Sequence, residues 1–91
     1  MYEKQTKIFN RSGLHARPAS VFVENANKFE SSIEIARVGD EENSVNAKSM
    51  VLLLTLGLCQ GEEAVITATG ADEKEAVNSL VDLIKSGFGE L

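Results

Sequence analysis

The sequence predicts an α+β fold in which an antiparallel β-sheet is covered on one side by amphipathic helices. Some segments alternate apolar and polar residues, as in strands with one buried face, and others repeat apolar residues every three or four positions, as on one face of a helix. Along the chain these segments follow the order β-α-β-β-α-β-α. The 91 residues contain no internal repeat or linker, so we expect a single domain spanning residues 1–91.

The first strand and the first helix are expected in the first third of the chain. Residues 2–9 contain no Gly or Pro and mix β-branched, aromatic and polar types, which favours a strand. After a turn at residues 10–13, a helix is predicted from about Ala16 to Asn27 or Lys28. Its expected buried face comprises Ala19, Phe22, Val23 and Ala26.

The middle of the chain is expected to form two strands. Residues 32–38 alternate, with Ile33 and Ile35 on one face, which is typical of a half-buried antiparallel strand. A turn is predicted at Gly39–Asn43, and a short partner strand at Ser44–Asn46.

A short second helix and the last strand are expected next. Ser49 precedes the apolar series Met50–Leu56 and is a favoured N-cap residue, while Gly57 suits the left-handed end of a helix. The segment Glu62–Thr69 is predicted to be a strand whose inner face is formed by Ala64, Ile66 and Ala68.

The third helix is expected to begin in an acidic segment after Gly70, where Asp72 and Glu75 are spaced like a capping box. Its apolar stripe comprises Ala76, Val77, Leu80, Val81 and Ile84. Two glycines then end the helix and leave a short tail of Phe88, Glu90 and Leu91.

The composition excludes several classes of function. With 14 acidic and 9 basic residues, the net charge of −5 argues against nucleic-acid binding, which needs a basic surface. No apolar run approaches the roughly 18 residues of a membrane span, so no membrane insertion is expected. The single cysteine, Cys59, cannot form an internal disulfide, which fits a reducing cytoplasm. We interpret it as a small packing residue and expect no metal or cofactor site.

The segment from Gly13 to Ala19 departs from the usual pattern of a helix start. It contains the only histidine and the only proline of the chain. His15 is expected at or next to the N-cap position, although Ser, Thr, Asp and Asn are preferred there. Arg17 puts a cation at the positive end of the helix, which costs about 0.3–1 kcal/mol. Arg11, Arg17 and Lys48 are expected to form a small cationic spot that suits an anionic ligand.

A bound anion would compensate for both departures. The free backbone N–H groups of Ala16 and Arg17, with the guanidinium, are suited to cradle a phosphate, and a neutral His15 imidazole there could attack phosphorus. The alternative is a lone histidine on a surface turn beside a solvated Arg17.

Three motifs carry a resemblance to a known family. Gly13-Leu14-His15-Ala16-Arg17-Pro18-Ala19 resembles the active-site signature of the HPr family, the histidine-containing phosphocarriers of the bacterial phosphoenolpyruvate–sugar phosphotransferase system. Asn46-Ala47-Lys48-Ser49-Met50 resembles the regulatory serine motif of this family, and Thr55-Leu56-Gly57-Leu58 followed by Gly61 resembles the segment before its last strand. The resemblance implies an open-faced β-sandwich, a four-stranded antiparallel sheet covered on one face by three helices.

The resemblance also implies a function. His15 would accept a phosphoryl group from phosphorylated enzyme I and pass it to sugar-specific IIA components, with Arg17 stabilising the phosphate. Ser49 would be a regulatory phosphorylation site for an HPr kinase/phosphorylase. The protein would then be a monomeric cytoplasmic carrier with no turnover of its own and no cofactor. The apolar run from Met50 is expected to offer Met50, Val51 and Leu54 for partner docking, or else to turn two or three of its residues into the core.

Two other classes of function remain open. One is a regulatory HPr-like protein that acts through phospho-Ser49 on a transcriptional or metabolic partner, although such relatives typically lack the histidine found here at His15. The other is an unrelated ligand-binding or RNA-binding α+β module, and the acidic charge and few aromatic residues disfavour the RNA-binding version.

Overall fold

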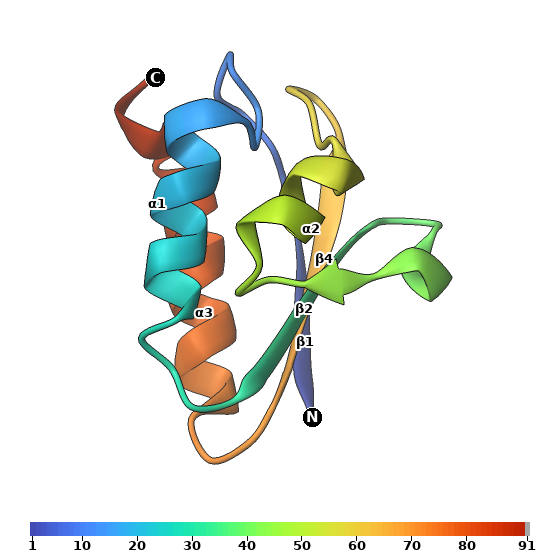
Figure 1. Ribbon diagram of the computed structural model, residues 1–91, viewed down its shortest axis with the longest axis vertical. Coiled ribbons are helices and arrows are strands. Elements are labelled where there is room, and N and C mark those ends of the chain that lie inside the picture. Colours follow the sequence, from blue (N-terminus) through green and yellow to red (C-terminus); the bar gives the residue numbers. More distant parts are fainter. Residues whose placement is uncertain (91) are drawn as a thin grey trace.

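The computed structural model of the protein describes residues 1–90 (Figure 1). The strands are β1 (Tyr2–Lys7), β2 (Ser32–Arg37), β3 (Val45–Asn46) and β4 (Glu63–Thr69), and the α-helices are α1 (Ala16–Ala26), α2 (Met50–Leu56) and α3 (Glu73–Lys85). Two single-turn 3-10 helices, η1 (Glu41–Asn43) and η2 (Gly87–Gly89), lie in the predicted turn and after α3. The predicted order of strands and α-helices is confirmed.

The four strands form one antiparallel sheet in the order β1-β4-β2-β3. The last strand of the sequence is an inner strand of the sheet, because Ala68 in β4 lies opposite Tyr2 in β1 and Ile33 in β2. The α-helices cover one face of this sheet, with α1 and α3 side by side (Figure 1). The expected open-faced sandwich is confirmed. Among residues 1–90, no helix is long and apolar enough to cross a membrane.

The core lies between the helices and the inner face of the sheet. The alternating residues predicted to face inward are buried in β2 and β4, and all five members of the α3 stripe are buried. In α1 the buried side chains include Ala19, Phe22 and Ala26 as predicted, together with Pro18, while Val23 is partly buried.

Asp72 does not form the expected capping box with Glu75. Its carboxylate accepts hydrogen bonds from the backbone N–H groups of Glu30, at 2.9 Å, and Ser31, at 3.0 Å, and from the Ser31 hydroxyl. The side chain that reaches back to the start of the helix belongs to Glu73, which accepts from the Gly70 amide at 3.1 Å. Asp72 therefore ties the α1–β2 connection to the start of α3, a contact that helix spacing alone cannot reveal.

The residues after α3 do not form the expected tail. Phe88 is 5% exposed and packs into the core, because η2 turns its side chain back onto the helices. Glu90 accepts hydrogen bonds from the Ser12 amide at 3.1 Å, the Ser12 hydroxyl at 3.0 Å and the Asn10 side-chain amide at 3.2 Å. The C-terminal turn is thus joined to the loop that leads to His15. The remaining residue of that predicted tail, Leu91, lies outside the described residues.

Candidate functional site

His15 is the N-cap of α1, as predicted. Its backbone is extended, with φ −133° and ψ 164°, its side chain makes no capping hydrogen bond, and it is partly exposed. Ala16 has φ +50°, a left-handed conformation that costs a non-glycine residue about 1–3 kcal/mol. Within residues 1–90, the backbone N–H groups of Ala16 and Arg17 donate no hydrogen bond. The helix start therefore presents free donors beside the only imidazole of the chain.

The loop before His15 packs tightly against the connection between α2 and β4. The Leu14 amide donates to the Leu58 carbonyl at 2.9 Å. Gly13 has φ +68°, and a Cβ at this position would lie 2.6 Å from the Leu58 carbonyl oxygen and 2.9 Å from Cys59 Cα. Asn10 closes the loop by donating from its side-chain amide to the Gly13 carbonyl at 3.0 Å. The position of His15 is therefore set by a segment more than forty residues away in the sequence.

Cys59 is not the small packing residue that the sequence predicted. Its side chain is exposed, and its Sγ lies 3.9 Å from Nε2 of His15 and 3.5 Å from the Gly57 carbonyl oxygen. The preceding residue, Leu58, is fully buried and takes the core position. Nothing in the sequence around Cys59 indicates this neighbour. In the described part of the chain, no group of three or more His, Cys, Asp or Glu side chains could hold a metal ion.

An ion pair that the sequence analysis missed supports the connection carrying Cys59. Arg37 Nε donates to Glu62 at 2.6 Å, and one of its terminal nitrogens donates to the carbonyls of Leu56, at 3.0 Å, and Gly57, at 3.2 Å. Glu62 in turn accepts from the Cys59 amide at 2.8 Å. The hydrogen bond from Arg37, followed by that from the Cys59 amide, holds the pKa of Glu62 below its ordinary value.

Arg17 is exposed in the first turn of α1, and its guanidinium has a partner within the protein. One terminal nitrogen donates to the Phe88 carbonyl oxygen in η2 at 2.6 Å. This contact explains how a cation is tolerated at the positive end of the helix, because a fixed carbonyl dipole offsets part of its cost. An anion bound at His15 would compete with this carbonyl for the guanidinium.

Ser49 is the N-cap of α2, as predicted, and its hydroxyl oxygen accepts a hydrogen bond from the Leu52 amide at 3.2 Å. The apolar run that follows is divided between core and surface. Leu53 is fully buried and Met50 partly so, whereas Val51 is 72% exposed and Leu54 is 41% exposed. The run therefore places Leu53 in the core and leaves other residues on the surface, while the docking role of the exposed residues stays a prediction. Leu52, which the docking prediction omitted, is also exposed, at 42%.

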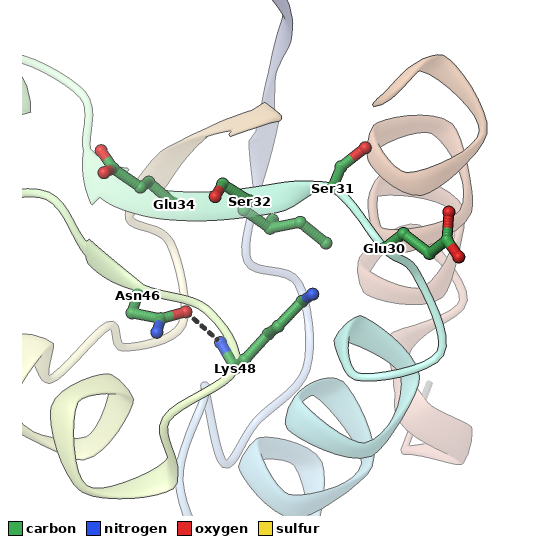
Figure 2. Close-up of a pocket in the computed structure, with 7 residues that line it drawn as sticks. Glu30, Ser31, Ser32, Glu34, Asn46 and Lys48 are labelled. Atoms are coloured by element: carbon green, nitrogen blue, oxygen red, sulfur yellow. Dashed lines mark hydrogen bonds between the residues drawn. The ribbon is translucent and has the colours of Figure 1, made fainter. Parts of the chain in front are cut away.

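Lys48 does not belong to a cationic spot with Arg17. Its ammonium donates to the Phe29 carbonyl at 2.7 Å, beyond the C-terminal end of α1, whereas Arg17 lies in the first turn of that helix. At 1.5 Å per residue, the 11 residues of α1 place the two ends of this helix about 16 Å apart. Figure 2 shows Lys48 and Asn46 at a cavity of about 240 Å³, and neither His15 nor Cys59 lines it.

The arrangement around His15 suits the transfer of an anionic group. A partly exposed imidazole is an accessible nucleophile. The free amide N–H groups at the positive end of α1 can donate hydrogen bonds to the negatively charged product. Arg17 lies in the same turn of the helix and adds a positive charge there.

Comparisons with known proteins agree with this chemistry. Residues 2–86 match the family described as the PTS HPr component phosphorylation site. The phosphocarrier protein HPr of Buchnera aphidicola is 48% identical over 88% of this chain and 91% of its own length, and the HPr-like protein Crh of Halalkalibacterium halodurans is 40% identical over 93% and 98%.

Two solved structures from Thermoanaerobacter tengcongensis are similar to the chain. A crystal structure of HPr-C-His is 46% identical, covers 100% of this chain and 99% of that one, and has a TM-score of 0.92. A crystal structure of an HPr dimer is 47% identical, covers 99% and 100%, and has a TM-score of 0.76. With the family match over most of its length, the chain belongs to the HPr family, the phosphocarrier proteins of the phosphotransferase system.

Proposed function

We propose that the protein carries a phosphoryl group on His15, which it takes from phosphorylated enzyme I and gives to sugar-specific IIA components. The observation that carries this proposal is the position of His15 at the start of α1, beside the unbonded N–H groups of Ala16 and Arg17. Because Nε2 faces Cys59, Nδ1 is the nitrogen that we propose as the acceptor. The phosphoryl charge would then lie at the positive end of the helix, with Arg17 as a second stabilising group.

The protein is proposed to act as a carrier and not as an enzyme. Among residues 1–90, no carboxylate is hydrogen-bonded to the imidazole of His15, so the chain itself holds no paired base for turnover. The partner enzymes would supply the remaining catalytic groups. We therefore propose a monomeric HPr-like domain over residues 1–91 that works in the bacterial cytoplasm without a cofactor.

The exposed apolar side chains of α2 are proposed as the docking surface for these partners. Val51, Leu52 and Leu54 are each more than 40% exposed, and Met50 is partly buried beside them. The C-terminal end of α2 leads through Gly57 to Cys59, which contacts His15. A partner bound on α2 would therefore also cover the phosphoryl-accepting side chain.

Ser49 is proposed as a regulatory phosphorylation site for an HPr kinase/phosphorylase. A phosphate on this N-cap would carry about −1.5 to −2 charges at a helix N-terminus, where negative charge is tolerated. The charge would lie at the end of the docking surface that is remote from His15, and it would repel an acidic partner.

A regulatory role like that of an HPr-like protein is the second candidate. The 40% identity with the protein named Crh and the capping position of Ser49 favour it. In that case phospho-Ser49 would create a binding surface for a regulatory partner, and His15 would be dispensable for the activity.

The decisive experiment is incubation with phosphoenolpyruvate and enzyme I, followed by intact mass measurement before and after mild acid. We expect one acid-labile phosphoryl group in the wild-type protein and in Ser49→Ala, and none in a folded His15→Ala. Undiminished labelling of His15→Ala would refute the assignment of the acceptor.

A further inference from the structure

The thiol of Cys59 lies between a carbonyl oxygen and the His15 ring. Its Sγ is 3.5 Å from the Gly57 carbonyl oxygen and 3.9 Å from His15 Nε2. The Gly57 carbonyl oxygen can only accept a hydrogen bond and is nearer to Sγ than Nε2 is, which favours a thiol hydrogen directed to Gly57. The sulfur then presents lone pairs to Nε2, and a sulfur lone pair is a weak acceptor. This geometry favours a hydrogen on Nε2.

The location of that hydrogen decides which ring nitrogen can react. A neutral imidazole carries one N–H, and the hydrogen bond made by one nitrogen sets the state of the other. We infer that Cys59 holds His15 in the Nε2–H tautomer and is thereby a positioning residue for phosphoryl transfer. This inference rests on the proposed function, in which Nδ1 accepts the phosphoryl group.

In the transfer step the Nδ1 lone pair forms the bond to phosphorus while the bond between phosphorus and the donor breaks, and the donor leaves with that electron pair. Nε2 keeps its hydrogen throughout, and the ring gains positive charge. A hydrogen-bond acceptor beside Nε2–H therefore stabilises the phosphorylated ring more than the unphosphorylated ring, because hydrogen bonds from charged donors are stronger. No proton passes to the sulfur.

The rest of the connection holds the backbone of Cys59 in place. The Cys59 amide donates to Glu62 at 2.8 Å, and Glu62 is held in turn by Arg37 at 2.6 Å. On the other side, the backbone of Gly13 leaves no room for Cys59 to move toward it. Although Cys59 lies on the surface in a loop, its backbone is therefore held beside the ring, and its Sγ contacts the Gly57 carbonyl oxygen and His15 Nε2.

The test uses the full chain under reducing conditions, with Cys59→Ala, Cys59→Ser and the neighbouring Gln60→Ala as a control. Two-bond proton–nitrogen correlation spectra of the His15 ring report which nitrogen carries the hydrogen. We expect the Nε2–H form to dominate in the wild type, to lose population in Cys59→Ala, and to recover in Cys59→Ser, whose hydroxyl can likewise donate one hydrogen bond and accept another. Gln60→Ala should leave the ring spectrum unchanged.

Phosphoryl uptake from enzyme I, measured on the same variants, should slow about two- to threefold in Cys59→Ala, as for the loss of one weak hydrogen bond. Thermal unfolding confirms that each variant is folded. An Nδ1–H ring in the wild type, or identical ring spectra for wild type and Cys59→Ala, would overturn the inference while leaving His15 as the acceptor. If His15→Ala is still labelled, the proposed function fails, and the ring spectra still decide whether Cys59 sets the tautomer.

Discussion

Gly13 and Gly57 have nearly the same backbone conformation, with φ of +68° and +64°, but different surroundings. A Cβ on Gly13 would overlap the backbone of Leu58 and Cys59, whereas a Cβ on Gly57 would have nothing within 4 Å. The pair therefore separates the cost of a left-handed residue from the cost of pushing two segments apart.

We expect Gly57→Ala to lower the free energy of unfolding by about 1–2 kcal/mol, the cost of the left-handed conformation alone. Gly13→Ala should cost about 1–3 kcal/mol more, because a backbone contact of 2.6 Å cannot be relieved by a side-chain rotation. Urea unfolding of both variants measures the difference. Equal losses would show that the His15 loop is free to move away from Cys59.

Arg17 provides the second prediction for a single residue. In Arg17→Ala the gain from removing a cation at the helix start opposes the loss of the hydrogen bond to Phe88, so stability should change by less than about 1 kcal/mol. Phosphoryl uptake should slow by about tenfold or more, as when a charge-stabilising donor is removed. The control is Arg11→Ala, which alters an exposed arginine in the loop before α1. Unchanged phosphoryl uptake in Arg17→Ala would show that Arg17 has no role in the transfer and serves only in its contact with η2.

The outcome at these residues shows what local sequence can reveal. His15 and Ser49 were located as N-caps because capping depends on residues a few positions apart. The contact of Cys59 with His15 spans 44 positions, and that of Arg17 with Phe88 spans 71. No residue pattern encodes such contacts, because they depend on how distant segments pack.

Among the elements, α2 combines a structural cap with an exposed apolar face. Its seven residues are too few for a helix that is stable alone, so the Ser49 cap and the buried Leu53 matter for its stability. The exposed side chains of Val51, Leu52 and Leu54 contribute little to the core and are available to a partner.

We expect Ser49→Ala to cost about 1 kcal/mol of stability, whereas Ser49→Asp should keep the cap and cost less. Transfer from enzyme I should slow in Ser49→Asp alone, and salt should partly restore it because it screens charge repulsion. Transfer rates at low and high ionic strength, measured together with thermal unfolding, test these expectations. Equal transfer rates for both variants would show that Ser49 is only a helix cap. The His15 ring spectrum should be the same in both, since Ser49 lies at the opposite end of α2 from Cys59.

At the level of the whole molecule, four carboxylates connect segments that are distant in sequence. The Met1 ammonium is 2.9 Å from Glu73 and lowers its pKa, and the Ser12 amide lowers that of Glu90. The Ser31 hydroxyl lowers the pKa of Asp72, as Arg37 does for Glu62. A carboxyl group whose pKa is lower in the folded state stabilises the fold above its unfolded pKa, and this stabilisation is lost as the pH falls through its folded pKa.

The free energy of unfolding is therefore expected to be constant near neutral pH and to fall below about pH 4.5. Urea unfolding between neutral pH and pH 3 measures this slope. Asp72→Asn should be less stable at neutral pH and should show a shallower acid slope. Glu24→Gln, which alters an exposed carboxyl group without a hydrogen bond among residues 1–90, should keep the wild-type slope. An unchanged slope in Asp72→Asn would show that its contacts do not persist in solution.

Most of the fold could be predicted from the periodicity of apolar residues in the sequence. The alternation of Ile33 and Ile35, and the stripe that includes Leu80, identified which residues face the core. Phe88 was wrongly predicted to lie in a C-terminal tail, because a single aromatic residue between two glycines forms no periodic pattern. Its burial depends on the turn that η2 makes. The strand order also needs long-range pairing, since β1 joins β4 across most of the chain.

The two ends of the described chain lie at opposite ends of α3 (Figure 1). Met1 is bound at Glu73, where this helix starts, and Glu90 is bound at Ser12, in the loop that leads to His15. The 13 residues of α3, which is about 20 Å long, lie between these two contacts. A protein tethered to a bead or fused to a reporter through its N-terminus should therefore keep His15 and α2 open to incoming proteins. The same attachment after the C-terminal turn would crowd them.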